Sequence, residues 1–256
     1  LNSFGSDEVY IEKYLQTPRH VEIQVAADDH GNAVHFFERD CSIQRRNQKI
    51  IEEAPAFDIP QEKLDEIRKI AVNTCKKLDY KGLGTFEFLY EDGNFYFIEM
   101  NTRLQVEHTI TEMITGIDLV KLQIMIAAGQ EIPLSQEDIN CRGHAIECRI
   151  NAEHHETFIP SPGKVTEFHP PGGFRIRTDS HLYSGYTVPQ YYDALIAKIC
   201  AHSSDRISAI RKMRVALEET YIVGINTNAP LHQKILIEPN FVEEKISINY
   251  LRDILN

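Results

Sequence analysis

The sequence lacks several features that would assign it to a class at once. No apolar run approaches the length of about 18 residues that a transmembrane helix needs, and the longest candidate is IMIAAG at 124–129. Basic residues are not in excess, because 27 Lys and Arg stand against 38 Asp and Glu. A net charge of −11 argues against a nucleic-acid-binding protein. We therefore expect neither nucleic acid nor a membrane as a partner.

The sequence has few cysteines, and their spacing does not suggest pairs. The chain has five Cys, an odd number, and no two of them form a CxxC motif. This usage predicts reduced thiols and argues against both a disulfide framework and a zinc site, so we expect a cytoplasmic protein. The chain begins at Leu1 rather than at a methionine and shows no signal peptide. We therefore interpret it as a fragment of a longer protein.

The common glycine-rich nucleotide-binding motifs are also missing. PSPGKVT at 160–166 contains a Gly-Lys pair, but Phe158 stands where a Walker A loop requires its first glycine. GGF at 172–174 lacks the G-x-G-x-x-G spacing. EHHE at 153–156 could hold a metal ion, although a solvated polar turn explains it more simply. These segments therefore predict no catalytic site.

Hydrophobic periodicity predicts an α+β protein. The texture of the sequence changes near residue 140, where Pro/Gly loops begin to alternate with short strands, so we expect two α+β units at 1–139 and 140–256. We find no internal repeat. Residues 41–50 are polar and basic and have no assigned element. We expect strands at 9–15, 20–28, 33–40, 85–90, 95–101, 144–150 and 194–202, and helices at 60–79, 107–128 (broken near Gly116) and 204–219.

The stretch FIEMNTRLQVEH at 97–108 carries polar groups at every second position. If the strand stays extended, these groups share one face, while the mostly apolar residues between them lie on the other. The simpler alternative to a functional site is an edge strand whose polar side faces solvent. The mixture of acids, amides and a guanidinium instead favours a functional site. The row consists of Glu99, Asn101, Arg103, Gln105 and Glu107.

A hairpin adds a second carboxylate to this row. Glu87 lies in the strand before Glu99, and a three-residue loop at 92–94 would place the two directly opposite each other. Like charges in that position destabilise a sheet unless a cation lies between them. With Asn101 beside them, these oxygen ligands predict a Mg²⁺ or Mn²⁺ site that also binds a substrate phosphate.

Several long blocks of the sequence resemble the biotin carboxylase family, within the ATP-grasp superfamily. Together they extend over nearly the whole chain, which makes the resemblance far more specific than a short motif would be. The blocks are EKYLQTPRHVEIQV (12–25), ERDCSIQRRNQK (38–49), GTFEFLY (84–90), FIEMNTRLQVEHTITEMITGIDLV (97–120), GHAIECRINAE (143–153) and FIPSPGKV (158–165).

The resemblance implies a fold and a reaction. The fold is the C-terminal part of an ATP-grasp domain, an antiparallel sheet with flanking helices, followed by a biotin carboxylase C-terminal domain. In the reaction, ATP phosphorylates bicarbonate to carboxyphosphate, whose carboxyl then passes as CO₂ to N1 of biotin on a separate protein. The sequence is most like the biotin carboxylase subunit of bacterial acetyl-CoA carboxylase, which serves fatty acid synthesis. The matching domains of pyruvate and propionyl-CoA carboxylases are near alternatives.

The resemblance also implies a role for each residue of the site. The general base that deprotonates bicarbonate is Glu107, and Arg149 stabilises the biotin enolate. The metal ligands are Glu87, Glu99 and Asn101, and the first two also contact ATP. The bicarbonate site is formed by Lys49, Arg103, Gln105 and Val106. The adenine end of ATP is met by Glu12, Lys13 and Leu15, and its ribose side by His20 and Gln44.

The sequence departs from the family pattern in two ways. Asn47 stands where a His beside the nucleotide is common. The family's N-terminal domain and glycine-rich lid are missing, and so is a Met-Lys-Met biotin-attachment motif. The resemblance thus implies ATP, Mg²⁺ or Mn²⁺, and biotin bound to a biotin carboxyl carrier protein, with carboxyltransferase subunits as further partners.

Three functions remain to be distinguished. The first is a catalytic fragment of a biotin carboxylase. The second is another ATP-grasp ligase such as a carbamoyl-phosphate synthetase, against which RLQVEH and HAIECRINAE argue. The third is a non-catalytic nucleotide- or partner-binding module. We expect the fragment to fold and to form a homodimer. Because nothing in the fragment covers the phosphates, we expect it to bind ATP–Mg²⁺ weakly and without useful turnover.

Overall fold

One eight-stranded antiparallel sheet runs through the molecule in the order β5-β4-β1-β2-β3-β6-β11-β9. The computed structural model describes residues 9 and 11–255. Two short antiparallel sheets of two strands each, β10-β7 and β12-β8, lie outside the large sheet. The strands are β1 Arg19–Ala27, β2 Ala33–Arg45, β3 Gln48–Ala54, β4 Gly82–Glu91, β5 Asn94–Asn101, β6 His144–Asn151, β7 Gly163–Lys164, β8 Glu167–His169, β9 Ile176–Ser180, β10 Thr187–Val188, β11 Leu195–Ser203 and β12 Tyr221–Val223.

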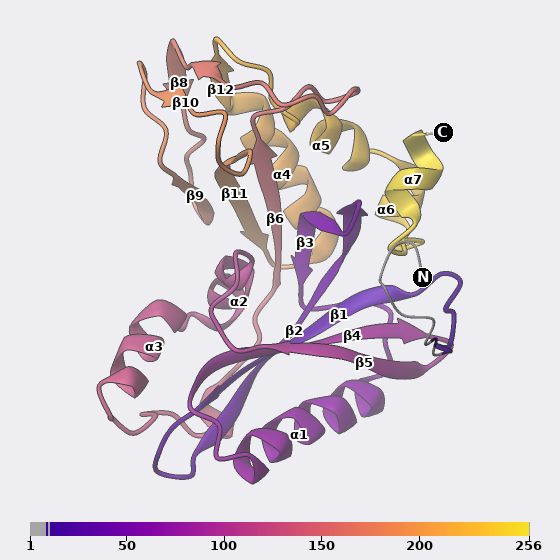
Figure 1. Cartoon of the computed structure of the whole chain (residues 1–256), viewed down its shortest axis with the longest axis vertical. Coiled ribbons are helices and arrows are strands. Elements are labelled where there is room, and N and C mark those ends of the chain that lie inside the picture. The colour runs from indigo at the N-terminus through magenta and orange to yellow at the C-terminus, as the bar shows by residue number, and fades with distance from the viewer. Residues whose placement is uncertain (1–8, 10, 256) are drawn as a thin grey trace.

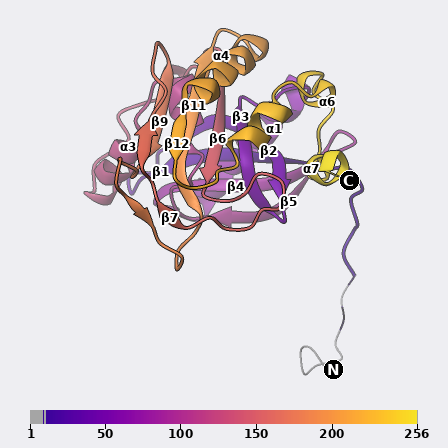
Figure 2. The same cartoon turned by 90° about the horizontal axis from the view of Figure 1, so that it is seen from above.

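Helices cover the sheet in two groups (Figure 1). In the lower part of the view α1 lies along strands β1 and β2, while in the upper part α4 packs on β11 and β6. Helices α3 and α7 lie at opposite ends of the molecule in both views (Figures 1 and 2). No helix in the described ranges is both long and apolar enough to cross a membrane. The helices are α1 Gln61–Lys77, α2 His108–Thr115, α3 Leu119–Ala127, α4 Arg206–Glu219, α5 Ala229–Ile235, α6 Pro239–Val242 and α7 Tyr250–Leu255, with a 3₁₀ turn at Gln136–Asp138.

The central strand β1 is buried along its whole length, yet only one of its faces is apolar. Ile23 and Val25 pack with α1 residues in one hydrophobic cluster. Because side chains alternate across a strand, Glu22 and Gln24 point to the opposite face, and both are fully buried. Buried polar groups of this kind require partners. They form the base of the site described below.

The sheet crosses the boundary that the sequence suggested at residues 139/140. Strand β6 pairs with β3 from Ile51–Cys148 to Ala54–Ala145. The largest hydrophobic cluster likewise joins β3 residues such as Ile51 to Phe241 near the C-terminus. The two units are therefore connected by continuous strand pairing, and the division at 139/140 stays a prediction.

Most predicted elements are present, including the break at Gly116, which ends α2 with a left-handed φ of 74°. One prediction was wrong, and one segment without an assigned element proved to be structured. Of residues 9–15, those that the structure describes form no strand, and Ile11 is 98% exposed. Residues 41–50 form the end of β2, a turn and the start of β3. That turn places Arg46 and Asn47 at φ 50° and 64°, as a two-residue hairpin turn requires.

Candidate functional site

The hairpin of β4 and β5 places Glu87 directly opposite Glu99, as predicted, but by a different route. The loop has two residues, Asp92 and Gly93, with φ of 50° and 74°. Such a loop alone would bring Ile98 opposite Glu87. A β-bulge next to Glu87 takes up one extra residue of β5 and restores the pairing with Glu99. The three-residue loop expected from the sequence was therefore wrong, and the bulge supplies the missing residue.

The two carboxylates belong to a row of charges that crosses four neighbouring strands. Glu87 pairs with Glu22 on β1, and Glu22 pairs with Arg39 on β2. Asn101 joins Glu87 to Glu99, since its Nδ2 donates to Glu87 Oε1 at 2.9 Å and to Glu99 Oε1 at 3.0 Å. Neighbouring strands thus bring together residues that are far apart in the sequence.

Arg39 is fully buried and organises the floor of the site. Its guanidinium donates to Glu22 Oε2 at 3.0 and 3.2 Å and to Gln105 Oε1 at 3.0 Å. Gln105 in turn donates from Nε2 to Glu87 Oε1 at 2.7 Å. Although burial acts in the opposite direction, the charges of Lys49 and Arg39 lower the pKa of Glu22 well below its usual value. Glu22 is therefore a permanent anion beneath the site.

Glu107 lies between two cations. Its Oε1 accepts a hydrogen bond from Lys49 Nζ at 2.7 Å, and its Oε2 accepts one from Arg149 Nη2 at 2.9 Å. Lys49 also donates to Glu22 and, at 3.2 Å, to Glu87. The charge of Glu22, with those of Glu107 and Glu87, raises the pKa of Lys49 despite burial. Arg149 therefore reaches Glu107 although it lies beyond the boundary expected at 139/140.

The alternating row at 99–107 does not lie on one extended strand. Strand β5 ends at Asn101, and residues 102–107 form an irregular segment that leads into α2. The row therefore does not share one strand face, whereas the strand predicted at 95–101 is present as β5. The row nevertheless converges on one place, because Gln105 and Glu107 are buried and joined to Arg39 and Lys49 by the contacts above.

These side chains surround a cavity of about 600 Å³. All predicted site residues line it except three, and Asn47 is also at its wall. The three are Glu12, Lys13 and Leu15, which precede β1. Lys13 instead donates to the Tyr96 hydroxyl on β5 at 2.6 Å. The predicted residues in the wall are His20, Gln44, Lys49, Glu87, Glu99, Asn101, Arg103, Gln105, Val106, Glu107 and Arg149.

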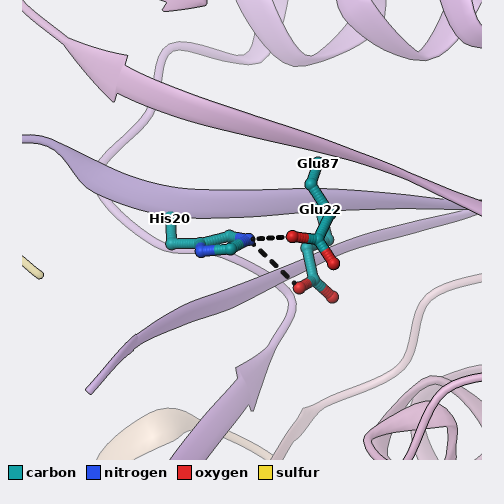
Figure 3. A group of neighbouring side chains, drawn as sticks. All are labelled: His20, Glu22 and Glu87. Atoms are coloured by element: carbon teal, nitrogen blue, oxygen red, sulfur yellow. Dashed lines mark ion pairs between the residues drawn. The ribbon is translucent and has the colours of Figure 1, made fainter. Parts of the chain in front are cut away.

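His20 lines this cavity, and its ring points towards Glu22 and Glu87 (Figure 3). Its Nε2 lies 3.0 Å from Glu87 and 3.2 Å from Glu22, as an ion pair without good hydrogen-bond geometry. Burial lowers the pKa of His20, but the interactions with Glu22 and Glu87 outweigh burial and raise it to about 9. The side-chain amide of Gln44 lies 2.8 Å from the other ring nitrogen.

The oxygen donors on this side suit a divalent cation. Glu87 and Glu99 face each other, Asn101 lies between them, and Glu99 is exposed to the cavity. Carboxylate and amide oxygens with room for water and phosphate are the ligands that Mg²⁺ prefers. The residues present therefore fit the metal expected from the sequence.

Sequence reasoning missed four buried residues that support the site. Glu22 and Arg39 lie in strands that were predicted correctly, and a signal was available, since an acid or a guanidinium within a buried strand needs a partner. Glu52 was missed because β3 was missed. Glu147 was read only as part of an apolar strand.

Two family models match the chain. The model described as "Carbamoyl-phosphate synthase L chain, ATP binding domain" matches residues 1–135. The model described as "Biotin carboxylase C-terminal domain" matches residues 147–253. The second match continues past the ATP-binding portion into the strands and helices that contain Arg149.

Among solved structures, the chain is similar to a biotin carboxylase–β,γ-ATP complex from Campylobacter jejuni. The two are 48% identical with a TM-score of 0.94, over 98% of this chain and 56% of that one. It is also similar to the biotin carboxylase domain dimer of the Hydrogenobacter thermophilus 2-oxoglutarate carboxylase in complex with MgADP, ADP and bicarbonate. The identity there is 46% and the TM-score 0.92, over 94% of this chain and 54% of that one.

Curated relatives give the same result. A biotin carboxylase of Haemophilus influenzae is 59% identical over 97% of this chain and 56% of its own length. One of the pyruvate carboxylase subunits of Methanothermobacter thermautotrophicus is 49% identical over 98% of this chain and 51% of its own length. The chain spans about half the length of the relatives it matches, and it belongs to the biotin carboxylase family.

Proposed function

We propose that the parent protein uses ATP and bicarbonate to carboxylate biotin on a carrier protein. This chain would supply the C-terminal portion of the ATP-grasp domain, 1–139, and the biotin carboxylase C-terminal domain, 140–256. The family-model matches at 1–135 and 147–253 support this division. The biotin carboxylase relatives support the reaction.

The position of Glu107 between Lys49 and Arg149 is the observation on which this proposal depends. Both oxygens of Glu107 accept a hydrogen bond from a cation, and a glutamate beside bound bicarbonate can act as its general base. Lys49 and Arg103 would hold bicarbonate within reach of Glu107. Gln105 and Val106 line the same cavity and would complete the bicarbonate site. Glu107 would take the bicarbonate proton, and the carbonate oxygen would attack the γ-phosphorus of ATP as ADP leaves.

The opposite wall of the cavity would hold ATP and the metal. Mg²⁺ or Mn²⁺, when bound, neutralises the phosphate charge that phosphoryl transfer develops. Its ligands would be Glu87, Glu99 and Asn101. The ribose would contact His20 and Gln44, and the adenine would lie near Glu12, Lys13 and Leu15, outside the cavity wall described above.

Arg149 would act in the second half of the reaction. Carboxyphosphate would break down to CO₂ and phosphate, and the released phosphate would take the N1 proton of biotin, which becomes an enolate. A guanidinium aimed at the enolate oxygen stabilises the developing negative charge. N1 would then attack CO₂ and form the carboxylated biotin.

The partners follow from the reaction. A biotin carboxyl carrier protein would bring biotin, which is not attached to this chain, and carboxyltransferase subunits would accept the carboxyl group. We propose acetyl-CoA carboxylase as the complex, a homodimer as the assembly and the cytoplasm as the location. The pyruvate carboxylase relatives favour a second candidate, the biotin carboxylase component of a pyruvate or propionyl-CoA carboxylase.

The decisive experiment compares two activities in the full-length parent protein. Arg149→Ala should lower the carboxylation of biotin about 100-fold or more, the cost of losing one oxyanion donor. The bicarbonate-dependent hydrolysis of ATP should be much less affected. Arg211→Ala, an exposed arginine on α4, is the matched control and should change neither rate.

Equal loss of both activities in Arg149→Ala would refute the enolate role. A full-length protein that binds ATP but never turns it over would support the non-catalytic module instead. Calorimetric titration of this chain alone with ATP–Mg²⁺ should give weak binding, and an ATPase assay should give no turnover, because the chain spans about half the length of its relatives. Micromolar binding with turnover would contradict that expectation.

A further inference from the structure

Behind Arg149 lies a pair of carboxyl groups that the reaction above does not use. Glu52 on β3 and Glu147 on β6 are direct partners across the two antiparallel strands. Both side chains are fully buried. Two ionised carboxylates directly opposed in a sheet repel each other, and burial removes the water that would screen them. The pair therefore needs a specific explanation.

Each carboxyl group has one oxygen with a partner and one without. Glu52 Oε1 accepts from Arg149 Nε at 2.5 Å, and Glu147 Oε2 accepts from Thr109 Oγ1 and, at 3.3 Å, from Cys200 Sγ. Glu52 Oε2 and Glu147 Oε1 have no hydrogen-bond partner among the described residues. A buried acceptor without a donor is costly, and a proton between two acceptors satisfies both at once.

The surrounding charges do not balance two anions. Arg149 divides its guanidinium between Glu52 and Glu107. Lys198 directs its Nζ to the carbonyl oxygen of Val106 at 2.6 Å. Burial raises the pKa of Glu52 to about 8 and also raises the pKa of Glu147. The charged and titratable groups that face the pair are Arg149, Lys198, Lys49, Glu107 and the thiols of Cys148 and Cys200.

We propose that Glu52 and Glu147 share one proton, and that Glu52 is thereby a positioning residue that holds the Arg149 guanidinium beside Glu107. The shared proton leaves one negative charge on the pair, which is enough to anchor Nε of Arg149. A second charge would compete with Glu107 for the same guanidinium. The main chain of Arg149 is fixed as well, because Asn228 and His232 donate to its carbonyl oxygen at 3.0 and 2.7 Å.

Infrared spectroscopy of the full-length protein tests the shared proton directly. The wild type should show, at neutral pH, the carbonyl stretch of a protonated glutamic acid that shifts on labelling with ¹³C-glutamate. Glu52→Gln and Glu147→Gln should each abolish that band, since either amide supplies the missing donor and leaves the other carboxyl ionised. The band should persist in Glu53→Gln, which removes the neighbouring buried acid of β3.

The same variants test the positioning role, and this part rests on the proposed function. Glu52→Gln should lower kcat for biotin carboxylation about tenfold, as expected when the Arg149 guanidinium loses a charged acceptor and keeps only a neutral amide oxygen. The KM for ATP should stay unchanged. In the wild type, carboxylation should decline at alkaline pH as the shared proton leaves, and Glu147→Gln should remove that decline.

The outcomes separate the two proposals. Absence of the protonated band in the wild type, or its persistence in both glutamine variants, would overturn the shared proton whatever the enzyme does. A Glu52→Gln enzyme with wild-type kcat would overturn the positioning role. A wild-type protein that does not carboxylate biotin would refute the proposed function, while the infrared band would still decide the state of the pair.

Discussion

Glu52 and Glu53 are neighbours on β3, both buried, and they point to opposite faces of the sheet. Glu53 accepts hydrogen bonds from Arg206 at 2.7 and 2.9 Å and contacts His144 at 2.8 Å. Burial alone would raise the pKa of Glu53, but His144 and Arg206 lower it to about 2. Glu52 has one partner, and burial raises its pKa to about 8.

The difference separates a structural network from a functional one. On the Glu53 face both carboxylate oxygens are paired, and the network ties β3 to α4 through Arg206. On the Glu52 face the partner is Arg149, which also contacts Glu107 at the cavity. Complete pairing makes a buried charge rigid, whereas an acid left half-paired in the interior takes up a proton instead.

The largest effect on the contrast between Glu53 and Glu52 is expected from the loss of Arg206. Arg206→Ala should lower the free energy of unfolding by about 3–5 kcal/mol, because it leaves Glu53 as a buried charge with only His144 beside it. The guanidinium also lies over the rings of Phe57 and Phe241, so packing is lost too. Urea denaturation followed by circular dichroism measures the change.

Arg211→Ala on the same helix is the control, since that side chain is exposed, and it should change stability little. If Arg206→Ala were as stable as the control, the Glu53 network would not be structural and the contrast with Glu52 would disappear.

The pH dependence of stability should differ in sign for the two acids. A carboxyl whose pKa rises on folding stabilises the fold below its ordinary value of 4.5, and this contribution is lost as pH rises through about 8 for Glu52. Glu53 behaves oppositely, since its contribution is present above 4.5 and is lost as pH falls through about 2.

The measurement is the free energy of unfolding of the wild type and Glu147→Gln between about pH 4.5 and pH 8, the window that the Glu52 shift defines. As pH rises through this window, the free energy of unfolding of the wild type should fall relative to that of Glu147→Gln, because the variant no longer needs the shared proton. Taking the difference cancels His20, whose pKa is raised to about 9 and whose contribution is also lost towards alkaline pH. Parallel curves for the two proteins would contradict the shared proton.

Sequence reasoning reached the elements and the facing pair Glu87 and Glu99, because local periodicity and turn residues carry that information. It could not reach the bulge that sets their register, since Ile98 looks like any other strand residue. The end of β5 at Asn101, by contrast, agrees with the strand predicted at 95–101. An alternating row can arise from an irregular segment when its residues find buried partners such as Arg39.

The buried acids that support the site could not be predicted, because the order of the strands brings them together and local sequence patterns do not specify that order. Glu22 meets Glu87 because β1 pairs with β4, and Glu52 meets Glu147 because β3 pairs with β6 across the expected boundary. Strand β3 itself was missed because its polar start, after Asn47, resembles a loop. Long-range pairing, not composition, brought these acids together.

The smallest expected effect concerns the other end of the carboxyl pair. Thr109 donates from its hydroxyl to Glu147 Oε2 and is fully buried. Thr109→Val keeps the shape and removes the donor, so it should lower the free energy of unfolding by about 1 kcal/mol.

Thr109→Val should also make Glu147 bind its proton more tightly, because the hydrogen bond from Thr109 lowers the pKa of the carboxyl. The loss of stability with rising pH should therefore continue to higher pH than in the wild type. Chemical denaturation across the same pH range measures both effects, and Thr115→Val, whose hydroxyl serves only backbone groups near the end of α2, is the matched control. A shift of the pH dependence in the control as well, or in neither variant, would mean that Glu147 does not hold part of the proton.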